Sequence, residues 1–406
     1  MTIYFVAGEV SADNHGAALM RSLRALDPGL KFIGRGGPQM KEIAGKQFKN
    51  WIDDAAVLGL WEVLRKYGYF REQFRETIRE ILESKPDAVV VIDYPGFNLR
   101  LARALRKQSR RQRIIYYISP QVWAWNRGRI KRMARSIDLV LCIFPFESDL
   151  YNESGLRAVF VGHPMIERLQ AQRHDVKREP NLIGLFPGSR MREVRKIFPV
   201  MIETANLLRA KNPQLRFEIA AASDELAREL EKVILETPLR SSRGEGRVRD
   251  AAARNRDTMQ IKRAETLAIM QRAFAGIVAS GSATLEAAYL RMPFVLVYKV
   301  AWPTYLAARL VVTVKYLGMP NVLANKEVVP EFIQHEAKPA AIAEAVQRLI
   351  GQARAREQMI SEFDSIMGKL GSDGASEKAA QVIVAEIGRT RQSDAGTCAH
   401  SKSSAK

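Results

Sequence analysis

The sequence contains little cysteine, no long apolar run and no cluster of metal-binding side chains. Its two cysteines, Cys142 and Cys398, lie in an apolar stretch and in a polar tail, which excludes a disulfide framework and a cysteine metal site. The five histidines lack metal-ligand spacing and no Asp-x-Asp pair offers a carboxylate site, so we expect no metal and no cofactor. No uninterrupted apolar run reaches about 18 residues, and we expect no membrane-spanning helix.

A chain of 406 residues is too long for one compact core, which favours two domains. Lysine and arginine (63) outnumber aspartate and glutamate (44), giving a net charge of +19. This charge indicates a polyanionic partner: nucleic acid, an anionic membrane surface or a phosphorylated substrate. Residues 1–7 pass directly from Met1 into a strand pattern, without a basic region or a cleavage site, so we expect the protein to stay in the cytosol.

Residues 275–297 have the pattern of a strand, a turn rich in serine and glycine, a helix and a second strand. Small side chains in such a turn let backbone N–H groups approach a phosphate at the start of the helix. Glu286 lies about one helical turn beyond Ser282 and is predicted to accept hydrogen bonds from ribose hydroxyls. The alternative is an ordinary N-cap and a solvated carboxylate. The candidate phosphate contacts are Ser280, Gly281, Ser282 and Thr284.

A second strand and turn of this kind occur at residues 182–190. Gly188 and Ser189 again bring the backbone close to the start of a helix, and the guanidinium of Arg190 suits a phosphate group. The pattern therefore predicts a second contact with the same anionic ligand.

Asp93 follows a nearly continuous apolar strand at residues 88–92. Ligands of open α/β sheets bind at the carboxyl ends of the strands, so Asp93 is placed to act as a general base on a substrate hydroxyl. In the alternative interpretation, Asp93 only stabilises the turn that follows.

Strands and helices alternate in both halves of the chain, which predicts an α/β fold of two Rossmann-like, doubly wound domains facing a central cleft. A basic segment at residues 238–259 is short of large apolar side chains and is predicted to begin as an exposed loop. The C-terminal helix is expected to pack on an N-terminal domain, either its own or a neighbour's. We expect an N-terminal domain at 1–169, a linker at 170–180, a nucleotide-sugar domain at 181–370, a C-terminal helix at 371–388 and a disordered tail at 389–406.

Residues 57–82 combine apolar and aromatic side chains with interspersed arginines and one lysine. This composition is typical of a helix in a membrane interface, where aromatic rings enter the headgroup region and cations meet lipid phosphates. The alternative is an amphipathic helix packed on its own sheet. The candidate docking side chains are Val57, Leu60, Trp61, Leu64, Tyr67 and Phe70.

Several motifs follow one another in a specific order along most of the chain. They are Val-Ala-Gly-Glu at 6–9, Ile-Asp-Tyr-Pro-Gly-Phe-Asn at 92–98, Ser-Pro-Gln-Val-Trp-Ala-Trp at 119–125, Gly-His-Pro at 162–164, Pro-Gly-Ser-Arg at 187–190, residues 279–286 and Pro-Asn-Val-Leu-Ala at 320–324. This ordered set resembles the lipid A disaccharide synthases, which are membrane-associated glycosyltransferases of the GT-B type.

The resemblance implies an inverting enzyme that joins UDP-2,3-diacylglucosamine to 2,3-diacylglucosamine 1-phosphate, forms the β-1,6-linked disaccharide and releases UDP. Asp93 is implied as the base, and Arg190 with the amides around 280–284 as the groups that stabilise departing UDP. Glu9 and Asn321 match family positions that line the cleft, and the resemblance implies that they contribute to nucleotide-sugar binding. Because both substrates carry acyl chains, the resemblance also implies a peripheral protein on the cytoplasmic face of the inner membrane, bound to anionic lipids, and favours docking by residues 57–82.

The chain departs from this family in two places. Ala12 lies where the family usually has glycine, and the basic segment 238–259 replaces a short strand and turn. The alternatives are another UDP-sugar enzyme of the same architecture, such as a UDP-GlcNAc 2-epimerase or a peptidoglycan glycosyltransferase, and a basic nucleic-acid-binding protein. No recognised nucleic-acid-binding motif occurs, so nucleic acid is not the expected partner. The sequence leaves open whether the protein is a monomer or a homodimer.

Overall fold

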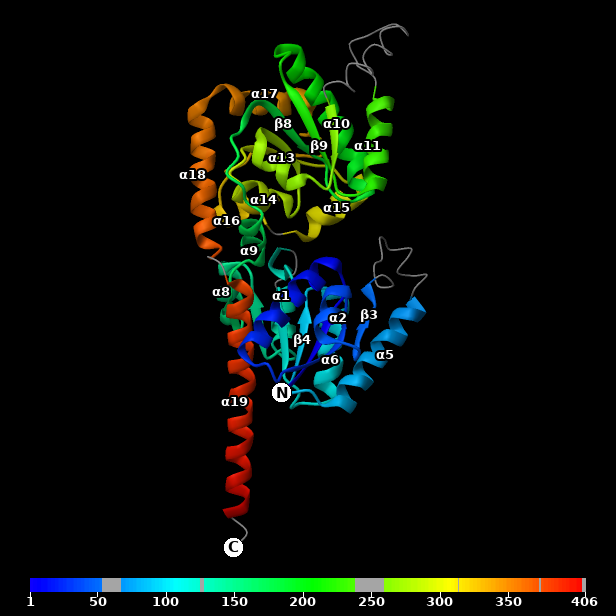
Figure 1. Ribbon diagram of the computed structural model, residues 1–406, viewed down its shortest axis with the longest axis vertical. Helices are drawn as coiled ribbons and strands as arrows, with labels where there is room; N and C mark the ends of the chain where they lie inside the picture. Colours follow the sequence, from blue (N-terminus) through cyan, green and yellow to red (C-terminus); the bar gives the residue numbers. More distant parts are fainter. Residues whose placement is uncertain (53–66, 125–127, 238–258, 313, 372–373, 404–406) are drawn as a thin grey trace. The chain divides into compact units, whose positions relative to one another are not determined.

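The computed structural model describes residues 1–52, 67–124, 128–237, 259–312, 314–371 and 374–403. The chain divides into two compact units, unit 1 (Met1–Glu167 with Leu370–Lys406) and unit 2 (Arg168–Lys369) (Figure 1). Each unit contains one parallel sheet with helices packed against it. The predicted α/β class is therefore confirmed.

The sheet of unit 1 has seven strands in the order β3-β2-β1-β4-β5-β6-β7. From β1 the chain first adds strands on one side and then on the other, so the strand order reverses between β1 and β4. The carboxyl ends at such a switch point are where open α/β sheets bind ligands. The strands are β1 (Thr2–Ala7), β2 (Lys31–Gly36), β3 (Phe48–Asn50), β4 (Ala88–Ile92), β5 (Ile114–Tyr117), β6 (Leu139–Cys142) and β7 (Ala158–Phe160).

The helices of unit 1 connect these strands, and α19 returns from the end of the chain to join them. They are α1 (Val10–Leu26), α2 (Pro38–Ala44), α5 (Tyr67–Ser84), α6 (Pro95–Gln108), the 3-10 helix η1 (Val122–Ala124), α7 (Gly128–Met133), α8 (Pro145–Glu153), α9 (Pro164–Ala171) and α19 (Ala375–Ser403). The unit boundary falls within α9.

The sheet of unit 2 has six strands in the order β10-β9-β8-β11-β12-β13, with its switch point between β8 and β11. Its strands are β8 (Glu179–Phe186), β9 (Arg216–Ala221), β10 (Met259–Arg263), β11 (Ala273–Ala279), β12 (Phe294–Tyr298) and β13 (Glu331–Ile333). Its helices are α10 (Met191–Lys211), α11 (Asp224–Glu236), α13 (Thr266–Arg272), α14 (Ala283–Tyr289), α15 (Trp302–Val311), α16 (Met319–Ala324), α17 (Pro339–Gly351) and α18 (Ala353–Lys369).

The central strands are mostly apolar because helices cover both faces of each sheet. All five residues of β4 are fully buried, as are Ile3 and Phe5 of β1. In unit 2, Ile277 and Val278 of β11 are equally buried. None of the helices in the described ranges is both long and apolar enough to cross a bilayer.

The C-terminal helix α19 is longer than the sequence predicts. α19 packs against α1 within unit 1, where Ala379, Ala380 and Ile383 are buried. Its backbone remains helical to Ser403, so the expectation of a disordered tail is wrong for residues 389–403. The reason is cooperative: once the first turns of a helix are packed, each further residue adds one backbone hydrogen bond, so the helix can extend without an apolar stripe of its own.

Two further predictions concern the linker and the basic segment. The expected linker 170–180 is shorter, because α9 extends to Ala171 and β8 begins at Glu179. Residues 238–258 of the basic segment are not among the described residues, and the segment ends in a strand, since β10 begins at Met259 and pairs with β9.

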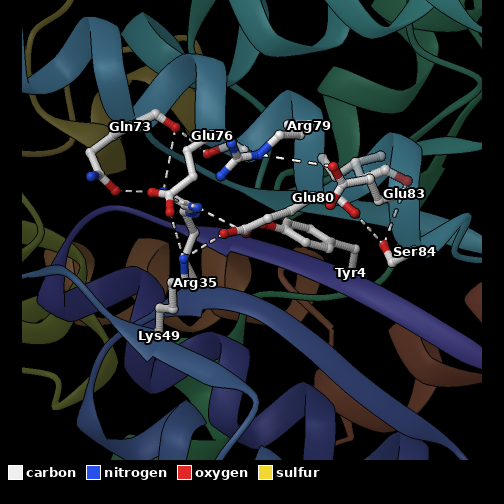
Figure 2. Close-up of polar contacts among 11 residues, drawn as sticks. Tyr4, Arg35, Lys49, Gln73, Glu76, Arg79, Glu80, Glu83 and Ser84 are labelled. Carbon is white, nitrogen blue, oxygen red and sulfur yellow. Dashed lines mark hydrogen bonds and ion pairs between the residues drawn. The ribbon is translucent and has the colours of Figure 1, made fainter.

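Helix α5 is fixed to the sheet of unit 1 by a network of charged and polar side chains (Figure 2). The fully buried guanidinium of Arg35 on β2 donates to Oε1 of Gln73 at 2.6 Å and to Oε2 of Glu80 at 2.8 Å. Lys49 on β3 binds Glu76 at 2.8 Å and Glu80 at 2.6 Å, and the hydroxyl of Tyr4 on β1 also donates to Glu80. Three neighbouring strands therefore hold one face of α5.

The other part of this attachment is apolar. Phe70, Phe74 and Ile78 of α5 pack against the core of unit 1. Phe70 is therefore half-buried in its own unit, as the alternative interpretation of an amphipathic helix packed on its sheet predicts, and its part in membrane docking stays a prediction. The other docking candidates, Val57, Leu60, Trp61, Leu64 and the side chain of Tyr67, lie outside the described residues.

Candidate active site

Asp93 lies at the switch point of unit 1, directly after β4. Asp93 and Tyr94 both have left-handed backbone angles, with φ of 44° and 49°, so the chain turns sharply before α6. The Asp93 carbonyl accepts hydrogen bonds from Asn98 Nδ2 at 2.7 Å and from the Tyr116 hydroxyl at 2.6 Å. A Cβ atom at Gly8 would lie only 2.4 Å from the Tyr94 ring, so glycine is required there. The backbone at residues 93–94 is thus held by contacts from α6, from β5 and from the residue that follows β1.

The pKa of the Asp93 carboxyl is raised towards neutral pH. Burial, and to a lesser extent the negative charge of Glu9, raise its pKa to about 6, and a hydrogen bond with the backbone of Tyr94 opposes the shift. Glu9 follows β1, and the carboxyl ends of the paired strands β1 and β4 meet at the same sheet edge. A half-buried carboxylate with a raised pKa, at an edge where ligands bind, is suited to general base catalysis.

Asp13, in the first turn of α1 just after Glu9, has a structural role. Its buried carboxylate accepts hydrogen bonds from the backbone N–H groups of Gly37 at 2.9 Å, Gln39 at 3.0 Å and Met40 at 3.0 Å. These groups lie at the N-terminus of α2, so Asp13 caps a neighbouring helix. Ala12, the departure from the family pattern, is buried without disturbing this cap.

The switch point of unit 2 brings together the two turns that the sequence predicts as phosphate contacts. Gly188 follows β8 with φ of +105°, and a Cβ atom there would lie 3.7 Å from the Cβ of Ala279, the last residue of β11. Ser189 and Arg190 are exposed, and Nη1 of Arg190 lies 3.2 Å from Oε1 of Glu193 in the first turn of α10. Arg190 is therefore held loosely at the start of a long helix.

The turn after β11 is shaped by its own hydrogen bonds. Gly281 has φ of +146°, and the buried hydroxyl of Thr284 donates to the Gly281 carbonyl at 2.7 Å. Thr284 therefore supports the turn, while Ser280 is half-buried and Ser282 is exposed. α14, which follows, comprises only seven residues.

Glu286 and Asn321 differ in how many of their side-chain hydrogen bonds are made within the protein. Oε1 of Glu286 accepts a short hydrogen bond from Nη2 of Arg168. Asn321 is fully buried: its amide nitrogen donates to Val329 and Glu331, and its oxygen accepts from the N–H groups of Val328 and Val329. All four hydrogen bonds of the Asn321 amide are used, so a direct contact with a nucleotide sugar is corrected to a role in holding α16 to β13.

A pocket of about 260 Å³ lies in unit 2 near this switch point, and sequence reasoning missed it. Burial raises the pKa of Tyr298, Glu193 adds to the effect and Arg190 opposes it, which places these three side chains near one another. Lys299, the residue after Tyr298, lines the pocket. Its lining residues are Lys196, Lys299, Val300, Trp302, Gln334 and His335.

The wall of this pocket is held by one side-chain amide. Gln334 is buried with φ of +52°; its Oε1 accepts from the Val300 N–H at 2.9 Å and its Nε2 donates to the Val300 carbonyl at 3.2 Å. Lys196 and Lys299 supply positive charge and Trp302 an exposed aromatic face. Such a set is suited to an anion attached to a planar ring. Within the described ranges, no group of three or more His, Cys, Asp or Glu side chains is arranged to hold a metal ion.

Solved structures of two other enzymes have a similar fold. The UDP-GlcNAc 2-epimerase from Neisseria meningitidis bound to UDP-GlcNAc is similar with a TM-score of 0.60 and 13% sequence identity, covering 95% of this chain and 100% of that chain. MurG of Acinetobacter baumannii gives a TM-score of 0.51 at 13% identity, over 94% and 99% of the two chains. At these identities the similarity concerns the fold alone. The fold, with two Rossmann-like units that each have a topological switch point, defines a protein of the GT-B class.

Sequence comparison then identifies the family. The family model described as lipid-A-disaccharide synthetase matches residues 3–384. The lipid-A-disaccharide synthase of Geobacter sulfurreducens is 35% identical over 398 residues, covering 95% of this chain and 97% of that protein, and that of Acidobacterium capsulatum is 37% identical over 392 residues, covering 92% and 93%. The chain belongs to the lipid-A-disaccharide synthetase family and is a glycosyltransferase of lipid A biosynthesis.

Proposed function

We propose that the chain transfers the sugar of UDP-2,3-diacylglucosamine to the 6-hydroxyl of 2,3-diacylglucosamine 1-phosphate. Asp93 takes the proton of that hydroxyl while its oxygen forms a bond to C1 of the donor sugar. The bond between C1 and the diphosphate oxygen breaks at the same time, and UDP leaves with the electron pair. Attack on the face opposite UDP inverts C1 and gives the β-1,6 linkage.

The observation that carries this proposal is the carboxyl of Asp93. Its pKa of about 6 keeps most of it ionised at neutral pH, and the raised value makes it a stronger base than an ordinary aspartate. Its place after β4, beside Glu9, is at the edge where a ligand of unit 1 is expected. A proton acceptor at a ligand-binding edge is what the acceptor hydroxyl requires.

We assign the UDP group to the switch point of unit 2. Arg190 and the amides around 188–189 and 280–284 stabilise the charge that develops on the departing diphosphate. Arg168 binds Oε1 of Glu286, and Oε2 is the atom that we assign to the ribose hydroxyls. The pocket lined by Lys299 and Trp302 adjoins this position. Because Arg190 and backbone amides supply the positive charge, we expect transfer that does not depend on a divalent cation.

We further propose that the enzyme works as a peripheral protein on the cytoplasmic face of the inner membrane, docked on anionic lipid through residues 57–70. The support is compositional: Val57, Leu60, Trp61 and Leu64 lie close together in the sequence, and Arg65 and Lys66 follow them. Replacing Trp61 and Leu64 by serine should weaken binding to vesicles that contain anionic lipid. Unchanged sedimentation with such vesicles would refute docking by this segment.

The test of the proposed reaction is transfer between the two acylated substrates in detergent micelles, with a chelator present. We expect the wild type to form disaccharide 1-phosphate and Asp93→Asn to lose at least about a hundredfold in kcat. Asp149→Asn, which alters an exposed carboxylate of unit 1, is the matched control and should retain wild-type activity.

Two results would contradict the proposal. Turnover of plain UDP-GlcNAc without transfer of the acylated donor would favour a UDP-GlcNAc 2-epimerase or a peptidoglycan glycosyltransferase. Full activity of Asp93→Asn with both acylated substrates would remove Asp93 as the base.

A further inference from the structure

Unit 1 contains a second buried carboxyl, which the proposed reaction does not use. Glu147 lies in the first turn of α8 and is 0% exposed. Its Oε2 accepts a hydrogen bond from the backbone N–H of Phe144 at 3.3 Å, which is the usual role of a glutamate at the start of a helix. Its Oε1 accepts from Nε1 of Trp123 at 2.9 Å. This second contact reaches out of α8 into another segment.

Trp123 belongs to the loop that follows β5, the segment with the most specific sequence motif of the chain. The loop is held to α8 at two points, because the hydroxyl of Tyr151 also donates to the Pro120 carbonyl at 2.8 Å. Glu147 and Tyr151 are four residues apart on α8 and therefore lie on one helix face, one turn apart. Trp123 is 4% exposed, and its ring meets that of Phe146 edge-on at 4.9 Å. One face of α8 thus fixes the loop 119–124.

The same strand that leads into this loop also holds Asp93. The Tyr116 hydroxyl donates to the Asp93 carbonyl at 2.6 Å, and the Asp93 N–H donates to the Tyr117 carbonyl at 3.1 Å. The loop 119–124 begins at the carboxyl end of β5, next to the carboxyl end of β4 where Asp93 lies. A displacement of this loop therefore occurs beside the reacting carboxyl.

A carboxyl buried at this site destabilises the fold, because it loses its contact with water. Burial raises the pKa of Glu147 to about 7, and hydrogen bonds from Trp123 and from the backbone oppose the shift without offsetting it. Its oxygens accept hydrogen bonds from an indole and from a backbone amide rather than from a cation. An apolar side chain of similar volume would avoid the desolvation penalty. A residue that lowers stability in this way is expected where function requires it.

We propose that Glu147 is a positioning residue that acts through Trp123: it fixes the loop 119–124 beside Asp93 in the shape that receives the acceptor sugar. This inference rests on the proposed function for the identity of the acceptor. Glu147 takes part in no chemical step, because its side chain is fully buried and contacts the loop rather than the substrate. It also gives the tryptophan-containing motif a physical role.

The test compares Glu147→Leu, which removes both hydrogen bonds, with Glu147→Gln, whose side-chain oxygen still accepts from Trp123. We expect Glu147→Leu to raise KM for 2,3-diacylglucosamine 1-phosphate about tenfold, to leave KM for the UDP donor within twofold, and to speed amide hydrogen exchange in residues 119–124. Glu147→Gln should recover most of the acceptor KM. Trp123→Phe should match Glu147→Leu, and the double variant should be no worse than either, because both act through one contact.

The matched control is Glu386→Gln. Glu386 is another buried carboxylate of unit 1, but it pairs with Arg157 and with Arg113, which precedes β5 at the opposite edge of the sheet. Its replacement should lower stability without changing acceptor KM or exchange in 119–124. An acceptor KM within twofold of wild type for Glu147→Leu would overturn the inference, and so would unchanged exchange. A wild type without transferase activity would instead refute the proposed function, and the exchange data would still decide whether Glu147 fixes the loop.

Discussion

Glu9 and Asp93 lie at the ends of two adjacent strands, where the charge of Glu9 adds to burial in raising the pKa of Asp93 to about 6. Glu9 is exposed, follows β1 and has no helix-capping hydrogen bond from its side chain, so its effect on Asp93 is open to a direct test. The pair sets the pH range in which the proposed base is ionised.

Glu9→Gln should shift the acid side of the pH profile. Because Asp93 must be ionised to accept a proton, kcat/KM of the wild type should fall as the pH drops below about 6. Removing the negative charge at position 9 lowers the pKa of Asp93, so the fall should begin at lower pH in the variant. The pH dependence of kcat/KM for both proteins is the measurement. An unmoved acid limb would show that Glu9 exerts no electrostatic effect on the base.

Asp93→Asn should make the protein more stable while it destroys activity. The pKa of Asp93 is about 6 in the folded protein and about 3.9 in an unfolded chain, so ionisation at neutral pH favours unfolding. After a discount for partial exposure, the gain on replacing it should be about 1–2 kcal/mol in the free energy of unfolding at pH 7.5. The gain should disappear below about pH 4, where both states are protonated. Urea unfolding at the two pH values tests this, and a loss of stability at pH 7.5 would contradict it.

Arg190→Gln should weaken UDP binding without affecting stability. The Arg190 side chain is 74% exposed and its contact with Glu193 is a surface ion pair, which contributes little to folding. A hydrogen bond from a cation to a phosphate is worth about 1.5–3 kcal/mol, so UDP affinity should fall roughly tenfold to a hundredfold. Calorimetric titration with UDP is the measurement. Arg192→Gln, the neighbouring exposed arginine of α10, is the control and should bind UDP as the wild type does.

Asn321→Ala should show the opposite behaviour. Its removal leaves buried groups of Val328 and Val329 without partners, which should cost about 2–4 kcal/mol in the free energy of unfolding. Since no hydrogen bond of the amide remains for a ligand, the folded fraction should bind UDP with an affinity within a few-fold of the wild type. A variant that keeps its stability but loses UDP binding would restore Asn321 to the ligand contacts.

The parts of the fold that the sequence predicts are those with a local pattern. The strand at 88–92 was predicted at its observed bounds because five consecutive apolar residues are typical of a buried parallel strand. β3, β10 and β13 were missed. They are short edge strands that contain charged residues, and the strand pairing that defines them is not encoded in neighbouring positions.

The same distinction applies to the candidate site. The neighbourhood of Glu9 and Asp93 follows from strand order, since each residue directly follows a central strand. The pair formed by Arg168 and Glu286 joins positions 118 residues apart, and the pocket at Lys299 and His335 depends on the unpredicted strand β13. Asn321 was assigned from its motif alone, but its hydrogen-bond partners, which only the folded chain brings together, give it a structural role.

Glu80→Gln should destabilise unit 1, because Glu80 is the residue on which Arg35, Lys49 and Tyr4 converge (Figure 2). Removing one carboxylate leaves the buried guanidinium of Arg35 less well compensated, and the loss should be about 2–4 kcal/mol in the free energy of unfolding. Although burial opposes it, hydrogen bonds from Lys49, Tyr4 and Arg35 lower the pKa of Glu80. The stabilisation is therefore complete above the unfolded-state pKa of about 4.3 and is lost as the pH falls through the lower folded-state pKa.

The matched control for this variant lies on the same helix. Glu83 is 71% exposed and only reaches Arg79, at 4.0 Å, so Glu83→Gln should change the free energy of unfolding by less than about 0.5 kcal/mol. Urea unfolding at pH 7 and pH 3.5, followed by far-UV circular dichroism, measures both variants. The difference between Glu80→Gln and the wild type should shrink at pH 3.5, because this pH lies below the unfolded-state pKa of about 4.3, where the lowered folded-state pKa of Glu80 contributes less to stability. Equal stability of the two variants at pH 7 would mean that the network does not hold α5 to the sheet.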